Sequence, residues 1–188
     1  LRRAAEAAPH RLALIDDNRS LTFAQVEALV RKQVEPARGS PTVAWPAASE
    51  SESLLRLYAL LDTQQLIVPV RTGAPVARFE PAAAFRFVDA AFAISTSAST
   101  ATEPKLAVLT HAALIAAADA SAARLGWNDD DRWLLCLPPH RIGGLSIVLR
   151  CLWAQRSVVL LPKFSATAVA AACARHAVTL LSLVPAML

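Results

Sequence analysis

Apolar residues follow two different spacings along the chain, and the spacing separates helices from strands. In segments such as 23–30 the apolar positions lie three or four residues apart, which predicts a helix with one buried face. Short uninterrupted apolar runs such as 66–70 predict buried strands. Helices are predicted at 1–8, 23–30, 54–61, 111–125, 145–154 and 165–176. Strands are predicted at 12–16, 42–45, 66–70, 85–89, 91–96, 106–109, 133–137, 157–161 and 178–184.

Polar residues at the ends of these segments add local signals. Residues 17–18, Asp-Asn, predict a turn after the first strand and therefore a hairpin. Thr22 and Gln25 have the spacing of a capping box at the start of a helix. Either Ser49 or Ser51 is predicted to cap the helix that follows.

The order of these elements predicts the fold class. Strands and helices alternate along the chain with short connectors, which is typical of an α/β fold with a largely parallel sheet and helices on both faces. Residues 71–84 are rich in Pro and Ala and predict a weak link. We therefore divide the chain into an N-terminal α/β subregion, 1–90, and a second α/β subregion, 91–188.

Composition then excludes several classes of protein. Of the 188 residues, 55% are hydrophobic and 18% are charged, so the chain has enough apolar surface to fold. No apolar run approaches the ~20 residues that span a bilayer, which argues against a membrane protein. The net charge of +4 is spread along the chain, which argues against a nucleic-acid partner. The three cysteines lack metal-ligand spacing and the carboxylates at 129–131 are typical of a solvated turn, so we expect reduced thiols, a cytoplasmic location and no metal site.

The most informative polar stretch runs from Thr96 to Lys105, between two predicted strands. Hydroxyl side chains and free backbone N–H groups in such a loop can hold phosphate oxygens, and a lysine at its end adds positive charge. The stretch lacks the GxxxxGK[ST] pattern of a Walker loop. From composition alone, a surface loop rich in serine and threonine is the simpler interpretation.

The order of the residues, however, resembles the phosphate loop of the adenylate-forming enzymes, such as acyl-CoA synthetases, which reads roughly Thr-Ser-Gly-[Ser/Thr]-Thr-Gly-x-Pro-Lys-Gly. The residues 110–111, Thr-His, follow at the distance found in that family. Residues 137–145 resemble its Leu-Pro-Leu-aromatic-His-x-x-Gly segment. The Gly-Gly-Leu-Ser and Leu-Val-Pro stretches are most similar to the o-succinylbenzoate–CoA ligases of menaquinone biosynthesis. The loop positions that match are Thr96, Ser97, Ser99, Thr100, Pro104 and Lys105.

This resemblance implies the N-terminal portion of the adenylate-forming fold. It implies an ATP-dependent ligase that activates a small carboxylic acid as an acyl-adenylate and then forms the thioester, with ATP, Mg and coenzyme A as cofactors. The residues it implies for binding phosphate are Thr96, Ser97, Ser99, Thr100 and Lys105. The residues it implies beside the acyl group are His140, Arg141, Gly143 and Gly144.

The loop also departs from the family pattern. Ala98 and Ala101 stand where the family has glycine, and a Cβ opposes both a positive φ and a close approach of phosphate to the backbone. Glu103 adds negative charge beside the predicted triphosphate site. We therefore expect weak or absent nucleotide binding by this chain.

A second departure lies at the acyl segment. The family histidine aligns with Arg141, and the family aromatic residue aligns with His140. An arginine at this place either pairs with a carboxylate of an acidic substrate or reaches solvent, and the sequence leaves both interpretations open.

The matching segments cover about the first third to two-fifths of the family pattern, so we expect an N-terminal fragment that is inactive alone. Its high apolar content is then expected to leave an exposed face that a partner or a second copy of the chain covers. The alternative is a degenerate, non-catalytic relative that acts as a binding or scaffold module. A third interpretation is an unrelated small α/β domain.

Overall fold

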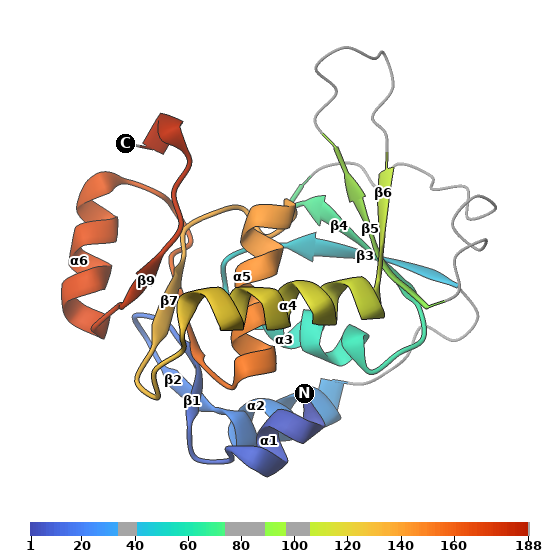
Figure 1. Ribbon diagram of the computed structural model, residues 1–188, viewed down its shortest axis with the longest axis horizontal. Helices are drawn as coiled ribbons and strands as arrows, with labels where there is room; N and C mark the ends of the chain where they lie inside the picture. Colours follow the sequence, from blue (N-terminus) through green and yellow to red (C-terminus); the bar gives the residue numbers. More distant parts are fainter. Residues whose placement is uncertain (34–40, 74–88, 97–105, 188) are drawn as a thin grey trace.

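In the computed structural model, which describes residues 1–33, 41–73, 89–96 and 106–187, the strands form two sheets rather than one (Figure 1). The five-stranded sheet has the order β2-β1-β8-β7-β9, with β1 at Leu12–Ile15, β2 at Ser20–Thr22, β7 at Arg132–Leu135, β8 at Ser157–Leu160 and β9 at Leu180–Leu181. The four-stranded sheet has the order β3-β4-β5-β6, with β3 at Thr42–Ala47, β4 at Leu66–Arg71, β5 at Ala90–Ser95 and β6 at Leu106–Thr110.

Most of the strand pairs are parallel, as the alternating pattern predicts. β8 lies between β1 and β7, so that Val158 is opposite both Leu14 and Trp133. The antiparallel pairs are the hairpin β1–β2, which confirms the predicted turn, and the pair β5–β6. Each sheet takes strands from both sides of residue 90, and the division of the chain at that residue stays a prediction.

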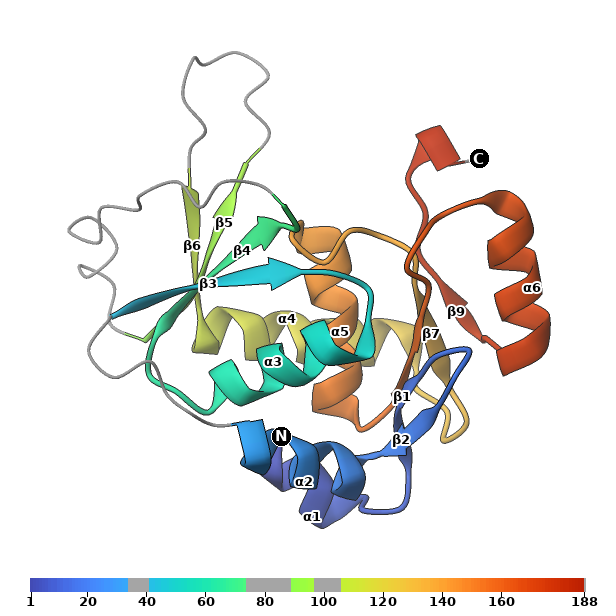
Figure 2. The ribbon, with the colours of Figure 1, turned by 180° about the vertical axis from the view of Figure 1, so that it is seen from behind.

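The helices cover the sheets, which confirms the α/β class (Figures 1 and 2). They are α1 at Arg2–Ala7, α2 at Phe23–Gln33, α3 at Ser51–Leu61, α4 at His111–Leu125, α5 at Ile142–Ala154 and α6 at Ala166–His176, and a 3-10 turn, η2, spans Pro185–Met187. Figure 1 shows α5 between the two sheets and α6 on the outer side of the five-stranded sheet.

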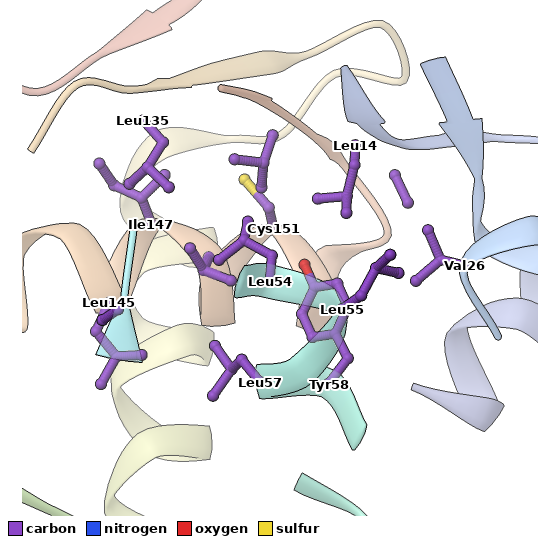
Figure 3. Packing of buried hydrophobic residues seen from close by; sticks show 14 of the residues in the cluster. Leu14, Val26, Leu54, Leu55, Leu57, Tyr58, Leu135, Leu145, Ile147 and Cys151 are labelled. Carbon is purple, nitrogen blue, oxygen red and sulfur yellow. The ribbon is translucent and has the colours of Figure 1, made fainter. Parts of the chain in front are cut away.

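One apolar cluster joins the two sheets through α3 and α5. Leu54 and Tyr58 of α3 are buried in it with Cys151 of α5 and Leu14 of β1 (Figure 3). Trp45 of β3 belongs to the same cluster. A second, smaller cluster lies between the other face of the five-stranded sheet and α6. Because the larger cluster contains side chains from both sheets, it holds the sheets in one relative position.

The predicted capping box is confirmed at the start of α2. The Thr22 N–H donates to Gln25 Oε1 at 2.8 Å, and the Gln25 N–H donates to Thr22 Oγ1 at 3.3 Å. The predicted serine cap of α3 is wrong, because Glu50 occupies the cap position and its side chain makes no capping bond. The Ser51 hydroxyl donates to the Asp16 carboxylate in the hairpin instead. The Ser51 hydroxyl, which the local spacing predicts as a helix cap, therefore binds a residue that is distant in sequence.

Two further boundaries differ from the pattern. The last predicted strand, 178–184, is reduced to the two residues of β9, and α5 begins at Ile142 rather than at residue 145. The predicted strand 85–89 lies outside the described residues except for its last position. None of the helices that the structure describes combines the length and the apolar character needed to cross a bilayer.

Candidate functional site

The carboxyl ends of strands from both sheets meet around one cavity of about 410 Å³. β3 and β4 of one sheet and β7 and β8 of the other all end at it, and Figure 1 shows the arrowheads of β3 and β4 pointing toward the first turn of α5. In α/β proteins, ligands bind outside the carboxyl ends of parallel strands. The residues that line the cavity are Ala47, Ala48, Ser49, Glu50, Arg71, Thr72, Cys136, Leu137, Pro138, Pro139, His140, Leu161, Pro162, Phe164 and Met187.

One wall of the cavity is a turn that runs from β7 into α5. The Arg141 N–H donates to the Pro138 carbonyl at 3.0 Å and closes the turn. Gly144 is buried behind it, where a Cβ would lie 2.5 Å from the Pro138 oxygen and 2.6 Å from the Leu137 oxygen. Two backbone carbonyls cannot yield as a flexible side chain can, so this position requires glycine. At Gly143 the nearest atom to an added Cβ is the side-chain atom Leu137 Cδ1, at 3.2 Å.

Two basic side chains line the cavity from opposite sheets. Arg71 is the last residue of β4 and is exposed, and His140 follows β7 and is partly buried. Burial lowers the pKa of His140 below its ordinary value of 6.5, and the positive charges of Arg141 and Arg71 lower it further. The imidazole of the free protein is therefore neutral at pH 7, while Arg71 keeps its charge.

Other polar groups of the wall are already engaged. The Cys136 thiol donates to the Ser182 carbonyl at 3.3 Å, and burial raises its pKa, so it remains protonated. The Thr72 hydroxyl makes a long contact of 3.5 Å with the Ala47 carbonyl. These groups shape the wall and carry no net charge at neutral pH.

The sequence-predicted site residues fall into three sets. Ser97, Ser99, Thr100 and Lys105 lie outside the described residues, and only Thr96, which is exposed directly after β5, has a described position. His140 lines the cavity, whereas Arg141 is exposed and is not among the lining residues. Gly143 and Gly144 form the first turn of α5, where Gly144 allows the helix to pack against the turn.

Arg71 and Thr72 also line the cavity, although no motif in the sequence points to them. They follow the apolar run of β4 directly, which is the position where the carboxyl-end rule places functional residues. The carboxyl-end rule could have identified them, but it applies only to strands of a parallel sheet. The structure shows that β3 and β4 pair in parallel over the whole length of both strands.

The three adjacent carboxylates serve the turn before β7. Asp131 is buried and accepts hydrogen bonds from the Asn128 N–H and the Thr179 hydroxyl, both at 2.7 Å. Asp129 forms ion pairs with Arg11 at 3.0 Å and with Arg156 at 3.1 Å. Within the described ranges no three His, Cys, Asp or Glu side chains gather as a metal site would require.

Comparisons with known proteins agree on one family. The family model described as AMP-binding enzyme matches residues 40–188. The 2-succinylbenzoate–CoA ligase of Bacillus mycoides is 36% identical over 104 residues, which cover 55% of this chain and 21% of that protein.

Solved structures show the same fold. The o-succinylbenzoate coenzyme A synthetase (MenE) of Bacillus subtilis in complex with AMP superposes with a TM-score of 0.86 at 24% identity, covering 99% of this chain and 48% of that one. The same enzyme in complex with ATP and a magnesium ion gives a TM-score of 0.80 at 23% identity, with 99% and 63% covered. The chain thus spans less than two thirds of the length of these relatives.

Proposed function

Because this chain belongs to the AMP-binding enzyme family, we propose that it takes part in the ATP-dependent activation of a small carboxylic acid as an acyl-adenylate and in transfer of the acyl group to coenzyme A. The family match over residues 40–188 carries this proposal. The identity with 2-succinylbenzoate–CoA ligases supports an aromatic dicarboxylic acid as the substrate. The activity requires regions of the relatives that these 188 residues do not cover, so we propose that the chain alone completes neither half-reaction.

ATP would supply the adenylate and the pyrophosphate leaving group, with Mg²⁺ bound to the phosphates. Ser97, Ser99 and Thr100 would donate hydroxyl hydrogen bonds to phosphate oxygens, and Lys105 would balance their charge. The described strands support this placement, since Ser95 of β5 pairs with Leu106 of β6. Ser95 and Leu106, the two described residues that flank the predicted loop, therefore lie opposite each other at the carboxyl end of β5.

On the acyl side, we propose that residues of the β7–α5 turn contact the carboxylic acid. His140 reaches the cavity, and Gly144 fixes the turn against α5. Apolar side chains of the same wall exclude water from an aromatic ring. Coenzyme A would supply the thiol that accepts the acyl group.

A second candidate function is binding without catalysis. Ala98 and Ala101 replace the two glycines of the family loop, and both methyl groups oppose close approach of a triphosphate. Under this candidate the chain is a degenerate relative that acts as a binding or scaffold module. Calorimetry of Mg·ATP binding distinguishes the two. A dissociation constant in the low micromolar range rules out the degenerate loop, whereas weak binding that tightens in Ala98→Gly/Ala101→Gly supports it.

The activity is tested by fusing the chain at residue 187 to the polypeptide that follows the matched region in the Bacillus mycoides ligase. We expect pyrophosphate release that depends on 2-succinylbenzoate. Lys105→Ala should lower kcat/KM by about 10-fold or more, because it removes a charge beside the phosphates. Lys32→Ala, at an exposed position of α2, is the matched control and should leave the rate unchanged.

Two outcomes contradict the proposal. A fusion that unfolds in one sharp transition yet releases no pyrophosphate with 2-succinylbenzoate or benzoate overturns the assigned activity. If the fusion does not fold, calorimetry of the 188-residue chain with 2-succinylbenzoyl-AMP decides, and absence of binding at millimolar ligand rejects a role in the adenylation site.

A further inference from the structure

The cavity at the strand ends contains basic side chains without partners. In the described part of the chain, neither the side chain of Arg71 nor that of His140 makes a hydrogen bond or an ion pair, although other arginine side chains of the protein pair with carboxylates. The one carboxylate of the lining, Glu50, belongs to the exposed cap position of α3. The pKa of His140 is lowered by burial first and then by the positive charges of Arg141 and Arg71.

Arg71 and His140 come from different sheets, so their approach is a result of the fold. The pKa of His140 is lowered in part by the charge of Arg71, which means that the two side chains share one electrostatic environment. Protonation of His140 would place a second positive charge near Arg71 without a counter-charge, and this repulsion adds to burial in keeping the imidazole neutral in the free protein. An anion placed between them would remove that repulsion and would favour the protonated imidazole.

The cavity is also lined by apolar side chains. Leu161 and Phe164 follow β8, and Met187 lies in η2. All three are partly buried, so they offer apolar contact without closing the cavity. A volume of about 410 Å³ is in the range of small-molecule sites, which bury an apolar body and orient it with a few polar groups.

We propose that this cavity binds an organic anion, with its carboxylate or phosphate on Arg71 and His140 and its apolar body against Leu161, Phe164 and Met187. Arg71 is the specificity-determining residue, because its guanidinium matches the planar, bidentate geometry of both anions. Arg141, the arginine that the motif pointed to, lies outside the lining and does not contact the ligand. This is the cavity in which the proposed function places the carboxylic acid, so the inference rests on that proposal for the chemistry of the ligand, while its test requires binding alone.

The test is calorimetry with the 188-residue chain at neutral pH, low salt and no ATP. The probes are 2-succinylbenzoate and phenyl phosphate, which carry both features, inorganic phosphate, which lacks the apolar body, and benzyl alcohol, which lacks the charge. We expect one of the two organic anions to bind, and the tighter one identifies the anion as a carboxylate or a phosphate ester. Inorganic phosphate and benzyl alcohol should each bind at least about 10-fold more weakly.

Single substitutions distinguish the contribution of Arg71 to anion affinity from that of other arginines. Arg71→Ala should weaken the organic anion about 10-fold or more, since it removes a charge-assisted hydrogen bond. Arg141→Ala and Arg56→Ala, the latter at an exposed position of α3, should change the dissociation constant less than about twofold. In proton NMR, saturation with the ligand should raise the pKa of the His140 imidazole, whose signal is assigned by its loss in His140→Ala.

The proposal fails if none of the probes binds at millimolar concentration. It also fails if Arg71→Ala leaves the affinity within twofold of the wild type, or if Arg141→Ala causes the larger loss. An unchanged His140 pKa in the saturated protein places the anion elsewhere. Because no arm contains ATP, these results are independent of pyrophosphate release by the fusion.

Discussion

Charged side chains at the turn before β7 and charged side chains at the cavity are arranged in opposite ways. At the turn, Asp129 contacts two arginines and Asp131 accepts two hydrogen bonds. At the cavity, Arg71 and His140 have no such partner among the described residues. Groups that are paired inside the protein contribute to its stability, whereas unpaired basic groups in a concave site are available to a ligand. The contrast separates charges that maintain the fold from charges that serve binding.

The largest effect is expected at the cavity wall, where backbone packing rather than charge defines the shape. Gly144→Ala should destabilise the protein by about 3 kcal/mol, because the new methyl group meets two carbonyl oxygens. Gly143→Ala is the matched control in the same turn and should stay within about 1 kcal/mol. Urea denaturation measures both. Equal effects of the two substitutions would show that α5 does not approach the turn as closely as described.

At the turn before β7 we expect the next largest effect. Asp131→Ala should cost about 2 kcal/mol, since the Asn128 N–H loses its acceptor and the Thr179 hydroxyl keeps only the longer contact of 3.4 Å with the Arg132 carbonyl. Asp130→Ala, at the exposed neighbouring position, should remain within about 0.5 kcal/mol. If thermal unfolding shows the two aspartates to be equivalent, the turn does not depend on buried pairing.

Arg156 at the turn and Arg71 at the cavity are expected to differ in effect: the first substitution should lower stability and the second should lower anion affinity. Arg156 is 12% exposed and donates to the Asn128 carbonyl at 2.6 Å and to the Ala154 carbonyl at 2.9 Å. Arg156→Ala should therefore cost about 1.5 kcal/mol of stability without altering anion affinity. Arg71→Ala should change the free energy of unfolding by no more than about 0.5 kcal/mol while weakening the anion. A clear loss of stability in Arg71→Ala would remove the distinction between the two regions.

The smallest effect is expected for a third paired carboxylate, Asp16 in the β1–β2 hairpin. Burial opposes its ionisation, but hydrogen bonds from the Ser51 hydroxyl and from the N–H groups of Asn18 and Arg19 outweigh burial and lower its pKa below 3.8. A lowered pKa in the folded state stabilises the protein above pH 3.8, and this contribution is lost as the pH falls through the folded-state pKa.

Asp16→Asn should therefore cost about 1 kcal/mol or less at neutral pH and nothing measurable once the carboxyl is protonated. Unfolding free energies measured along an acid titration test this convergence. A constant difference between variant and wild type at every pH would assign the effect to packing rather than to charge.

Local patterns predicted the elements well but not their partners. The capping box at Thr22 and the whole of α4 follow from residues that are close in sequence. The pairing of Leu14 with Val158 does not, because a buried apolar run is compatible with any neighbouring strand. A single sheet was therefore predicted where two exist. The two-residue β9 was overestimated for a related reason, since apolar composition alone does not require a ladder partner.

The candidate site shows the same limit. His140 belongs to a motif with a recognisable order, so the sequence identified it. Arg71 belongs to no motif and becomes significant only when β4 and β7, in different sheets, end at the same cavity. Arg141 shows the reverse case, since the motif pointed to it while the turn directs it away from the lining. The direction of a side chain at a turn depends on tertiary packing, which spacing does not encode.

The position of β8 between β1 and β7 has a consequence for how the chain folds. β1 and β2 are synthesised first. β8, which pairs with the other edge of β1, is the second-to-last strand of its sheet to be synthesised. The four-stranded sheet has partners that are closer in sequence and is expected to form earlier, because short loops close faster. During synthesis the hairpin therefore carries the apolar side chains of Leu14 and Ile15 without their final cover. Such an intermediate is prone to aggregation, and chaperone dependence should concentrate on the interval before residues 157–160 leave the ribosome.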